Sequence, residues 1–309
     1  MNQYNIYKKQ LNDEMVKIIS SAISSKKILE RILYALKNGK RLRPIIMIDI
    51  CINSGASFES IINSAVSIEL IHNASLIIDD LPCMDNDDFR RNQLSFHKKY
   101  NLHEAQIISK FMVDLAIKLI VSNFKIDTQK YHKYKIIINN ICKNLGILGV
   151  AGGQLIDITP LNAHLNKREL LDTIEKKKEK KLEIEDLFQK KTCGFFEIAF
   201  LTGYLLGNDV HMENIQDVLD CAKHFGLAFQ IYDDFDDIEQ DKKRVECNLN
   251  DPNYINNFGL KEAYDSFHYS LGIFKTKMTK LKLFSITMEQ LYDFLNINVE
   301  KKYGDFKNN

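Results

Sequence analysis

Apolar residues recur at three- and four-residue spacing along most of the chain, and few segments alternate strictly between apolar and polar positions. Residues 15–22, 115–120 and 215–222 show this spacing clearly. A repeat near 3.6 residues is typical of helices with one buried face. Only four prolines and thirteen glycines interrupt the pattern, and no internal repeat or Pro/Gly/Ser-rich linker divides it. We therefore expect one all-α domain over residues 1–309.

An acidic stretch directly follows one of the apolar runs. The run 64–81 predicts a helix that Pro82 ends, so Asp79 and Asp80 lie in its last turn. Anions at a helix C-terminus are disfavoured by a few tenths to about 1 kcal/mol each, and the five aspartates in residues 79–88 also repel one another. A divalent cation removes both problems, and carboxylates suit Mg²⁺, which commonly bridges to phosphates. A solvated acidic loop is the alternative interpretation.

A second acidic group lies on a later predicted helix. Gln230, Asp233, Asp234 and Asp237 fall at i, i+3, i+4 and i+7 beside the apolar residues of 225–232. This spacing puts them in one polar stripe, where bare carboxylates repel by a few tenths of a kcal/mol per pair. A bound metal reverses the sign of that interaction. We therefore expect two aspartate clusters that face each other across a cavity.

Cations cluster at a helix boundary near the start of the chain. Lys40, Arg41 and Arg43 lie between Gly39 and Pro44. Guanidinium groups match phosphate oxygens in geometry, and lysine adds a point charge, so the loop is a candidate anion site. An exposed basic surface loop is the alternative.

Three further polar residues share helical faces with these groups or with each other. His72 precedes Asp79 by seven residues, which is two helical turns, so it either points along the same groove or is a core histidine. Gln154 and Asp157 share a face after a pair of glycines. The glycines permit close approach of a backbone or ligand, or they loosen the helix.

Bulk properties exclude several classes of protein. The net charge of +1 offers no basic excess for nucleic acid. The six cysteines form no CxxC pair, which favours a reducing compartment and hence a cytoplasmic location. No run of about 18 apolar residues is free of charge, so we expect no membrane span. The N-terminus lacks the apolar core of a signal peptide.

Taken together, the motifs resemble the trans-isoprenyl diphosphate (polyprenyl) synthase family, especially the geranylgeranyl diphosphate synthases of plants and bacteria. Residues 75–91 resemble the first aspartate-rich motif, including the four residues between its aspartate pair and the next aspartate. Residues 39–44 resemble the isopentenyl diphosphate loop, and residues 226–237 resemble the second aspartate motif. The resemblance implies an antiparallel all-α barrel or bundle of ten or more helices around a deep central cavity, usually in a homodimer.

The resemblance also implies roles for individual residues. Two or three Mg²⁺ ions, with Mn²⁺ as an alternative, would be held by Asp79, Asp80, Asp85, Asp233, Asp234 and Asp237. Lys191 would join the catalytic set. The residues expected to bind isopentenyl diphosphate, the allylic diphosphate or the polar lining are Lys40, Arg41, Arg43, His72, Arg90, Arg91, Thr192, Gln154, Asp157 and Gln230.

The implied reaction joins isopentenyl diphosphate to an allylic diphosphate of five to fifteen carbons. Product length should depend on the hydrocarbon slot below Asp79, where Ala74 and Ser75 are both small. We therefore expect a C20 product, geranylgeranyl diphosphate, with C15 or longer chains as alternatives. The resemblance departs at Cys247, where a lysine is expected, although cations at 242–244 lie close in sequence.

Two other functions stay open at this point. The chain could be a non-catalytic or weakly active partner subunit of such a synthase, an idea that rests on the missing lysine. It could also be a class I terpene cyclase, although a cyclase would not need the second diphosphate site of Lys40, Arg43 and His72. The intact aspartates favour an active prenyltransferase, because a regulatory subunit has no physical need for clustered like charges.

Overall fold

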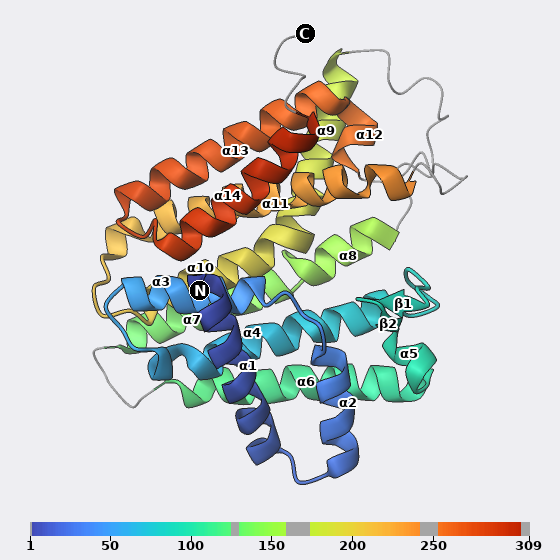
Figure 1. The fold of residues 1–309 in the computed structure, drawn as a ribbon, viewed down its shortest axis with the longest axis vertical. Coiled ribbons are helices and arrows are strands. Elements are labelled where there is room, and N and C mark those ends of the chain that lie inside the picture. The colour runs from blue at the N-terminus through green and yellow to red at the C-terminus, as the bar shows by residue number, and fades with distance from the viewer. Residues whose placement is uncertain (1, 125–129, 159–173, 242–252, 304–309) are drawn as a thin grey trace. The chain divides into compact units, whose positions relative to one another are not determined.

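The structure, a computed structural model, describes residues 2–124, 130–158, 174–241 and 253–303, and nearly all of them lie in helices (Figure 1). This confirms the all-α fold class. The first half contains α1 (Gln3–Ala22), α2 (Lys26–Leu36), α3 (Leu42–Asn53), α4 (Phe58–Asp79), α5 (Phe96–Lys99), α6 (Leu102–Ser122) and α7 (Tyr131–Leu145). The second half contains α8 (Val150–Ile158), α9 (Ile174–Phe188), the π-helical turn η1 (Gln189–Cys193), α10 (Gly194–Leu205), the 3₁₀ turn η2 (Met212–Asn214), α11 (Ile215–Asp241), α12 (Tyr254–Phe258), α13 (Leu260–Lys280) and α14 (Ile286–Tyr303).

One short hairpin was not expected from the sequence. Strands β1 (Phe89–Arg90) and β2 (Gln93–Leu94) pair antiparallel, with Phe89 opposite Leu94. Arg91 and Asn92 join the strands, and both have positive φ angles, 52° and 61°. Positive φ at both positions is the geometry of a type I′ hairpin loop, usually formed by Asn-Gly or Gly-Gly. The pair Arg-Asn carries little of that signal, which is why the hairpin was missed.

The described residues form two compact units: Met1–Ile137 with Leu201–Val210, and Ile138–Phe200 with His211–Asn309. The chain therefore passes between units at three points, after Ile137, Phe200 and Val210. Neither unit is one continuous segment with its own linker. The single domain expected over residues 1–309 stays a prediction.

Helix α4 forms the centre of the first unit. It packs against α1, α2, α3 and α6, and it is buried around most of its circumference. A helix that is apolar on all sides is stable only where neighbours cover every side. Some of its buried polar side chains bond to neighbouring helices: Ser67 Oγ, for example, donates to the carbonyl of Ala116 in α6 at 2.9 Å. The helix is thus a rigid base for the acidic turn that follows it.

The second unit is organised around α11, which packs against α12, α13, α14 and η1. Aromatic rings fill its interior, with the centroids of Phe196 and Phe225 5.1 Å apart and those of Phe225 and Phe274 5.0 Å apart. Edge-on and tilted ring pairs of this kind add stability beyond the area that they bury. The apolar positions of α11 therefore face the core and leave its polar stripe for other contacts.

Two helical stretches are long and apolar enough by composition to cross a membrane, Phe58–Asp79 and Tyr131–Ile156. Within their most apolar windows, 67% of the first and 39% of the second are buried inside the structure. Buried core helices pass the same test of length and composition. The expectation of no membrane span stays a prediction.

Candidate active site

The acidic turn after α4 folds back on itself. Asp79 is the last residue of α4, and the backbone N–H of Asp85 donates to its carbonyl at 2.9 Å. This bond keeps Asp85 next to Asp79 although six positions separate them. Asp79 is partly buried and Asp85 is exposed. The turn thus brings together the backbones of two residues with carboxylate side chains, the ligand type that Mg²⁺ prefers.

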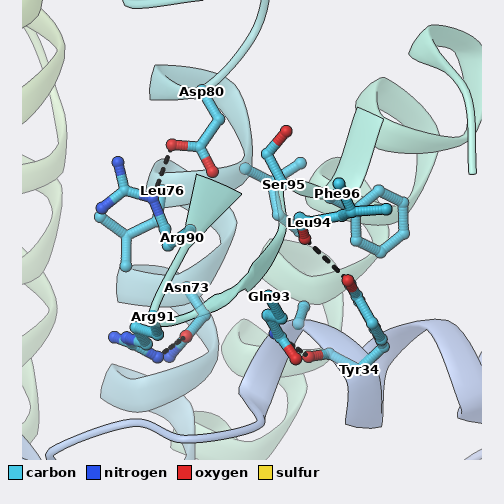
Figure 2. A pocket seen from close by; sticks show the side chains of 12 residues that line it. Tyr34, Asn73, Leu76, Asp80, Arg90, Arg91, Gln93, Leu94, Ser95 and Phe96 are labelled. Atoms are coloured by element: carbon cyan, nitrogen blue, oxygen red, sulfur yellow. Dashed lines mark hydrogen bonds and ion pairs between the residues drawn. The ribbon is translucent and has the colours of Figure 1, made fainter. Parts of the chain in front are cut away.

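Asp80 is placed differently from Asp79. Its carboxylate is buried at 2% exposure and accepts from Arg90 Nε at 2.5 Å, as Figure 2 shows. Arg90 also lies 3.6 Å from Asp87. Burial raises the pKa of Asp80 to about 6, and the guanidinium of Arg90 opposes that rise by stabilising the ionised form. Asp80 therefore orients Arg90, whereas its predicted role as a metal ligand stays a prediction.

A small pocket lies beside this ion pair, between α2, α4 and the hairpin (Figure 2). The guanidinium groups of Arg90 and Arg91 lie on its hairpin side, while Asn73 belongs to α4 and Asp80 directly follows that helix. Tyr34 Oη donates to the carbonyl of Leu94 at 2.7 Å and so fixes the hairpin to α2. Two predicted diphosphate-binding arginines are thereby presented by one short, braced loop.

The structure brings Arg43 and His72 together, as the sequence predicted. Arg43 NH1 lies 3.3 Å from His72 Nε2. Burial and the positive charges of Arg43 and three other arginines hold the pKa of His72 well below its ordinary value, so the imidazole is neutral at pH 7. Lys40 is exposed, and its carbonyl accepts from Tyr4 Oη at 2.6 Å. His72 is therefore part of a cationic cluster and not an isolated core histidine.

Arg41 differs from its expected placement. Its side chain points inward at 6% exposure, with NH1 2.7 Å from Glu69 Oε1 and Nε donating to Asn12 Oδ1 at 2.9 Å. A buried guanidinium needs a paired carboxylate, and Glu69 supplies it. The structure gives Arg41 an internal set of partners where the sequence suggested a substrate contact. Glu69 was missed, although one acidic residue in the apolar run 61–78 was a usable signal.

The two residues expected to limit product length lie on different parts of α4's surface. Ala74 is 1% exposed, and its carbonyl accepts from Ser109 Oγ of α6 at 3.1 Å. Ser75 is partly exposed and donates to the carbonyl of His72 within its own helix at 2.9 Å. Ala74 thus packs against α6, and the chain-length roles of both residues stay predictions.

In the second unit, the π-helical turn η1 carries Lys191 and Thr192 against α8. A Cβ atom added at Gly153 would lie 2.9 Å from the backbone N of Lys191 and 3.0 Å from Lys190 Cβ. Only glycine allows this approach, so of the alternatives offered by the glycine pair, close contact with another backbone is the one observed. Gln154 follows directly and is partly buried.

The polar stripe of α11 is joined by hydrogen bonds to η1 and α12. Thr192 Oγ1 donates to Gln230 Oε1 at 2.7 Å, and Gln230 Nε2 lies 3.3 Å from Asp234 Oδ1. The backbone N–H of Tyr254 donates to Asp234 Oδ2 at 2.7 Å. Asp234 is 6% exposed, whereas Asp233 is partly exposed. The second aspartate of this motif is therefore buried and hydrogen-bonded, like Asp80 in the first.

A second buried acid, Glu197, supports η1 and was not predicted. It accepts from Gln189 Nε2 at 2.6 Å and from Asn144 Nδ2 at 3.1 Å, and it is 6% exposed. The signal was again one acid within an apolar segment, residues 194–205. Glu197 fixes the start of the turn that presents Lys191.

Some predicted residues lie outside the description. Cys247 and the cations at 242–244 are not described, nor are the side chains of Asp157 and Asp237. Within the described residues, no group of three or more His, Cys, Asp or Glu side chains is arranged to hold a metal ion. The side chains of the acidic turn that carry metal-type donors are carboxylates, the ligand type that Mg²⁺ prefers, and the bound metal stays a prediction.

Comparison with known proteins gives a consistent result. The polyprenyl synthetase family matches residues 25–252. Farnesyl diphosphate synthase of Bacillus subtilis is 31% identical over 214 residues, which are 69% of this chain and 67% of the relative. Geranylgeranyl pyrophosphate synthase 7 of Arabidopsis thaliana, a chloroplastic protein, is 28% identical over 283 residues, 89% of this chain and 74% of the relative.

A solved structure gives the same fold. The geranyltranstransferase of Thermotoga maritima matches with a TM-score of 0.72 at 23% identity, covering 97% of this chain and 99% of that one. This likeness supports the all-α fold class, and the sequence matches confirm the resemblance stated from the motifs. The chain belongs to the polyprenyl synthetase family.

Proposed function

We propose that this chain is a Mg²⁺-dependent prenyltransferase that condenses isopentenyl diphosphate head-to-tail with an allylic diphosphate. The observation that carries the proposal is the arrangement of charges along α4. Its C-terminal end holds Asp79 with Asp85 beside it, and residues one to two turns earlier contact two guanidinium groups, at His72 and Asn73. One helix therefore supports both a metal-type acidic end and a cationic site. Binding two diphosphates needs both a metal site and a cationic site.

The proposed roles follow from charge. Bound Mg²⁺ would neutralise the allylic diphosphate as it leaves, with Asp79 and Asp85 as ligands. Asp233 keeps the metal-binding role that the resemblance implies. Arg90, oriented by Asp80, would bind that diphosphate. Lys191, carried on η1, keeps the diphosphate-binding role that the resemblance implies. The allylic C–O bond breaks and its electron pair goes to the diphosphate. The double bond of isopentenyl diphosphate then forms the new C–C bond, and a proton passes to the released diphosphate.

Arg43, His72, Arg91 and Lys40 would hold isopentenyl diphosphate in line with that reaction. A neutral His72 donates or accepts one hydrogen bond without adding charge, while Arg43 beside it supplies the charge. Positioning two reactants in this way replaces a bimolecular encounter with a pre-oriented one, which can contribute on the order of 7–11 kcal/mol to lowering the barrier.

For the product we propose geranylgeranyl diphosphate, C20. The support is the small size of Ala74 and Ser75, one turn before the acidic end of α4. Named relatives include both farnesyl and geranylgeranyl synthases, so C15 is the competing product. We also propose a homodimer and a cytoplasmic location. The five described cysteines are all free, in keeping with a reducing compartment.

The test is incorporation of labelled isopentenyl diphosphate by the purified chain with Mg²⁺ and, separately, C5, C10 and C15 allylic diphosphates. We expect incorporation with at least one primer and a longest product of C20. Asp79→Ala and Asp233→Ala should abolish turnover, while Asp114→Ala, an exposed aspartate of α6, should not. No incorporation with any primer would overturn the proposal and favour a partner-subunit role. A longest product of C15 would overturn only the C20 assignment.

A further inference from the structure

A buried polar network in the first unit runs between two of the cationic segments assigned to isopentenyl diphosphate. It starts at Arg41, whose NH1 lies 2.7 Å from Glu69 Oε1, with side-chain exposures of 6% and 2%. Its Nε donates to Asn12 in α1, and its NH2 donates to the carbonyl of Leu36 at the end of α2. One guanidinium thus joins α1, α2 and α4 at the start of α3.

The network continues from Glu69 to Arg91. Glu69 Oε1 also accepts from Asn73 Nδ2 at 2.9 Å, one helical turn along α4. Asn73 Oδ1 in turn accepts from Arg91 NH1 at 2.9 Å, a contact visible in Figure 2. The amide orientation is forced, because guanidinium groups only donate and the carboxylate only accepts. Arg41, Glu69, Asn73 and Arg91 therefore form one continuous chain of hydrogen bonds.

Both ends of the network adopt backbone conformations that side-chain-bearing residues seldom occupy. Arg41 has a φ angle of 66° and Arg91 has 52°. Positive φ is costly for residues other than glycine unless surrounding contacts fix it. The fixed contacts here are those of the side chains themselves. The conformations of the two loops are thus tied to the same buried carboxylate.

Stability alone is a weak reason for such an arrangement. Replacing a buried ion pair by apolar residues of similar volume is often neutral or stabilising. The network instead fixes the positions of neighbouring cationic residues. Lys40 precedes Arg41 directly, Arg43 follows it by two positions, and Arg91 is held by Asn73.

We propose that Arg41, Glu69 and Asn73 are positioning residues that set the geometry of Arg91 and of the 40–43 loop for isopentenyl diphosphate. This replaces the direct substrate contact expected for Arg41, and it rests on the proposed function. The three residues act through Lys40, Arg43 and Arg91, so their loss should weaken binding of isopentenyl diphosphate selectively. The allylic primer, bound at the acidic end of α4, should be little affected.

The experiment compares Asn73→Ala, Arg41→Lys and the double variant with the wild-type chain. Asn73→Ala removes the hydrogen bond to Arg91 and leaves the Arg41–Glu69 ion pair. Arg41→Lys keeps the positive charge but loses the several N–H donors of the guanidinium group. We expect KM for isopentenyl diphosphate to rise about tenfold in each, the size of one hydrogen bond to a charged group. KM for the primer should change less than twofold. The double variant should show less than the product of the two effects.

Two controls separate positioning from general loosening of the fold. Ser67→Ala removes a buried hydrogen bond from the same helix, on the side that faces α6, and should leave both KM values unchanged. Glu69→Gln keeps the acceptor atom and removes the charge, so it should fall between wild type and Asn73→Ala. Equal rises in both KM values, or strictly multiplicative effects, would overturn the network.

Failure of the function and failure of the network give different results. A wild-type chain that neither binds isopentenyl diphosphate in calorimetry nor incorporates it overturns the proposed function, and the network's purpose with it. An active wild type whose Asn73→Ala and Arg41→Lys variants keep the wild-type KM overturns the network alone. Folding of each variant is checked by its urea midpoint, and Glu69→Gln remains as the mildest variant should the others unfold.

Discussion

Two aspartates that occupy second place in their acidic pairs share the same surroundings. Asp80 is 2% exposed and pairs with Arg90, while Asp234 is 6% exposed and accepts from Gln230 and Tyr254. Each is therefore already held by groups of the protein. The sequence Asp-Asp does not show that the second aspartate of each pair is buried while the first is partly exposed, because burial and partners depend on the fold.

The raised pKa of Asp80 predicts a pH dependence of stability. An unfolded aspartate has a pKa near 3.9, whereas Asp80 in the folded chain has a pKa of about 6. The folded state therefore holds an extra proton between those values, and its stability falls as pH rises through that window. Asp80→Asn has no such proton. The difference in free energy of unfolding, variant minus wild type, should grow from pH 4 to pH 6 and then level off.

This prediction is checked by urea unfolding of both chains at pH 4, 5, 6 and 7 without divalent metal. Asp88→Asn removes one exposed negative charge from the same turn and controls for net charge. A difference between Asp80→Asn and wild type that stays constant across the series would contradict the raised pKa.

Gly153 makes a second prediction at this scale. Gly153→Ala should destabilise the fold by about 1–3 kcal/mol, because the new methyl group would meet the backbone of Lys191 at 2.9 Å. It should also lower turnover by displacing Lys191. Gly272→Ala in α13 is the matched control, since nothing lies within 4 Å of the added atom, and it should stabilise by about 0.5–1 kcal/mol. Thermal unfolding and turnover of both variants test this prediction. Equal stabilities of the two variants would contradict the close approach of Gly153 to the backbone of Lys191.

At the scale of elements, α4 and α11 both carry acidic residues at their C-terminal ends, but different neighbouring segments contact those ends. Each packs apolar residues into the core of its unit and places acidic residues near its C-terminal end. The turn after α4 folds back onto Asp79, whereas α11 meets the start of α12 through Asp234. A continuous apolar run predicted most of α4 and apolar periodicity predicted α11, because both patterns are local properties of the sequence. Neither pattern gave a sign of α12 or of the β1–β2 hairpin, both of which depend on contacts with other segments.

The bond from Tyr254 to Asp234 predicts that one side chain orders the start of α12. Asp234→Asn keeps only one acceptor oxygen, so either Gln230 or the N–H of Tyr254 loses its partner, at a cost of about 1–3 kcal/mol. Hydrogen exchange at the Tyr254 amide should speed up more than at Ile255, whose amide is capped by Asn253 at 3.0 Å.

The control for this variant is the next exposed acid on the same helix. Asp236→Asn removes a surface ion pair with Lys302, which is worth about 0–1 kcal/mol, and should leave the Tyr254 amide unchanged. If the two variants showed the same exchange at Tyr254, the anchoring role of Asp234 would be wrong.

At the scale of the whole molecule, ligand binding links the acidic and basic residues to overall stability. Mg²⁺ and inorganic diphosphate together should raise the melting temperature more than the sum of each alone, since carboxylates need the metal to accept an anion nearby. At one hundred times Kd the gain is about 2.7 kcal/mol, or on the order of 5 °C. Asp79→Asn should lose the Mg²⁺-dependent part of the shift. An equal shift with diphosphate plus chelator would contradict a metal-bridged site.

The candidate site was predicted in its residue types and less well in its partnerships. The resemblance gave Arg43 and His72 one ligand, and in the structure Arg43 NH1 lies 3.3 Å from His72 Nε2. The inward orientation of Arg41 could not be predicted, because the sequence does not show whether a basic loop residue faces water or a buried acid. Glu69 and Glu197 were equally invisible as partners, since their contacts lie 28 and 53 positions away along the chain.

The sequence by itself determined the all-α class, parts of several long helices and the family. These rest on spacing between near neighbours and on the order of short motifs, both of which are readable one segment at a time. Only the tertiary structure decided which charges are held inside: Arg41 against Glu69, Asp80 against Arg90, and Asp234 against the start of α12. The physical reason is desolvation. The cost of burying a charge, and the partner that offsets it, exist only once distant segments have packed together.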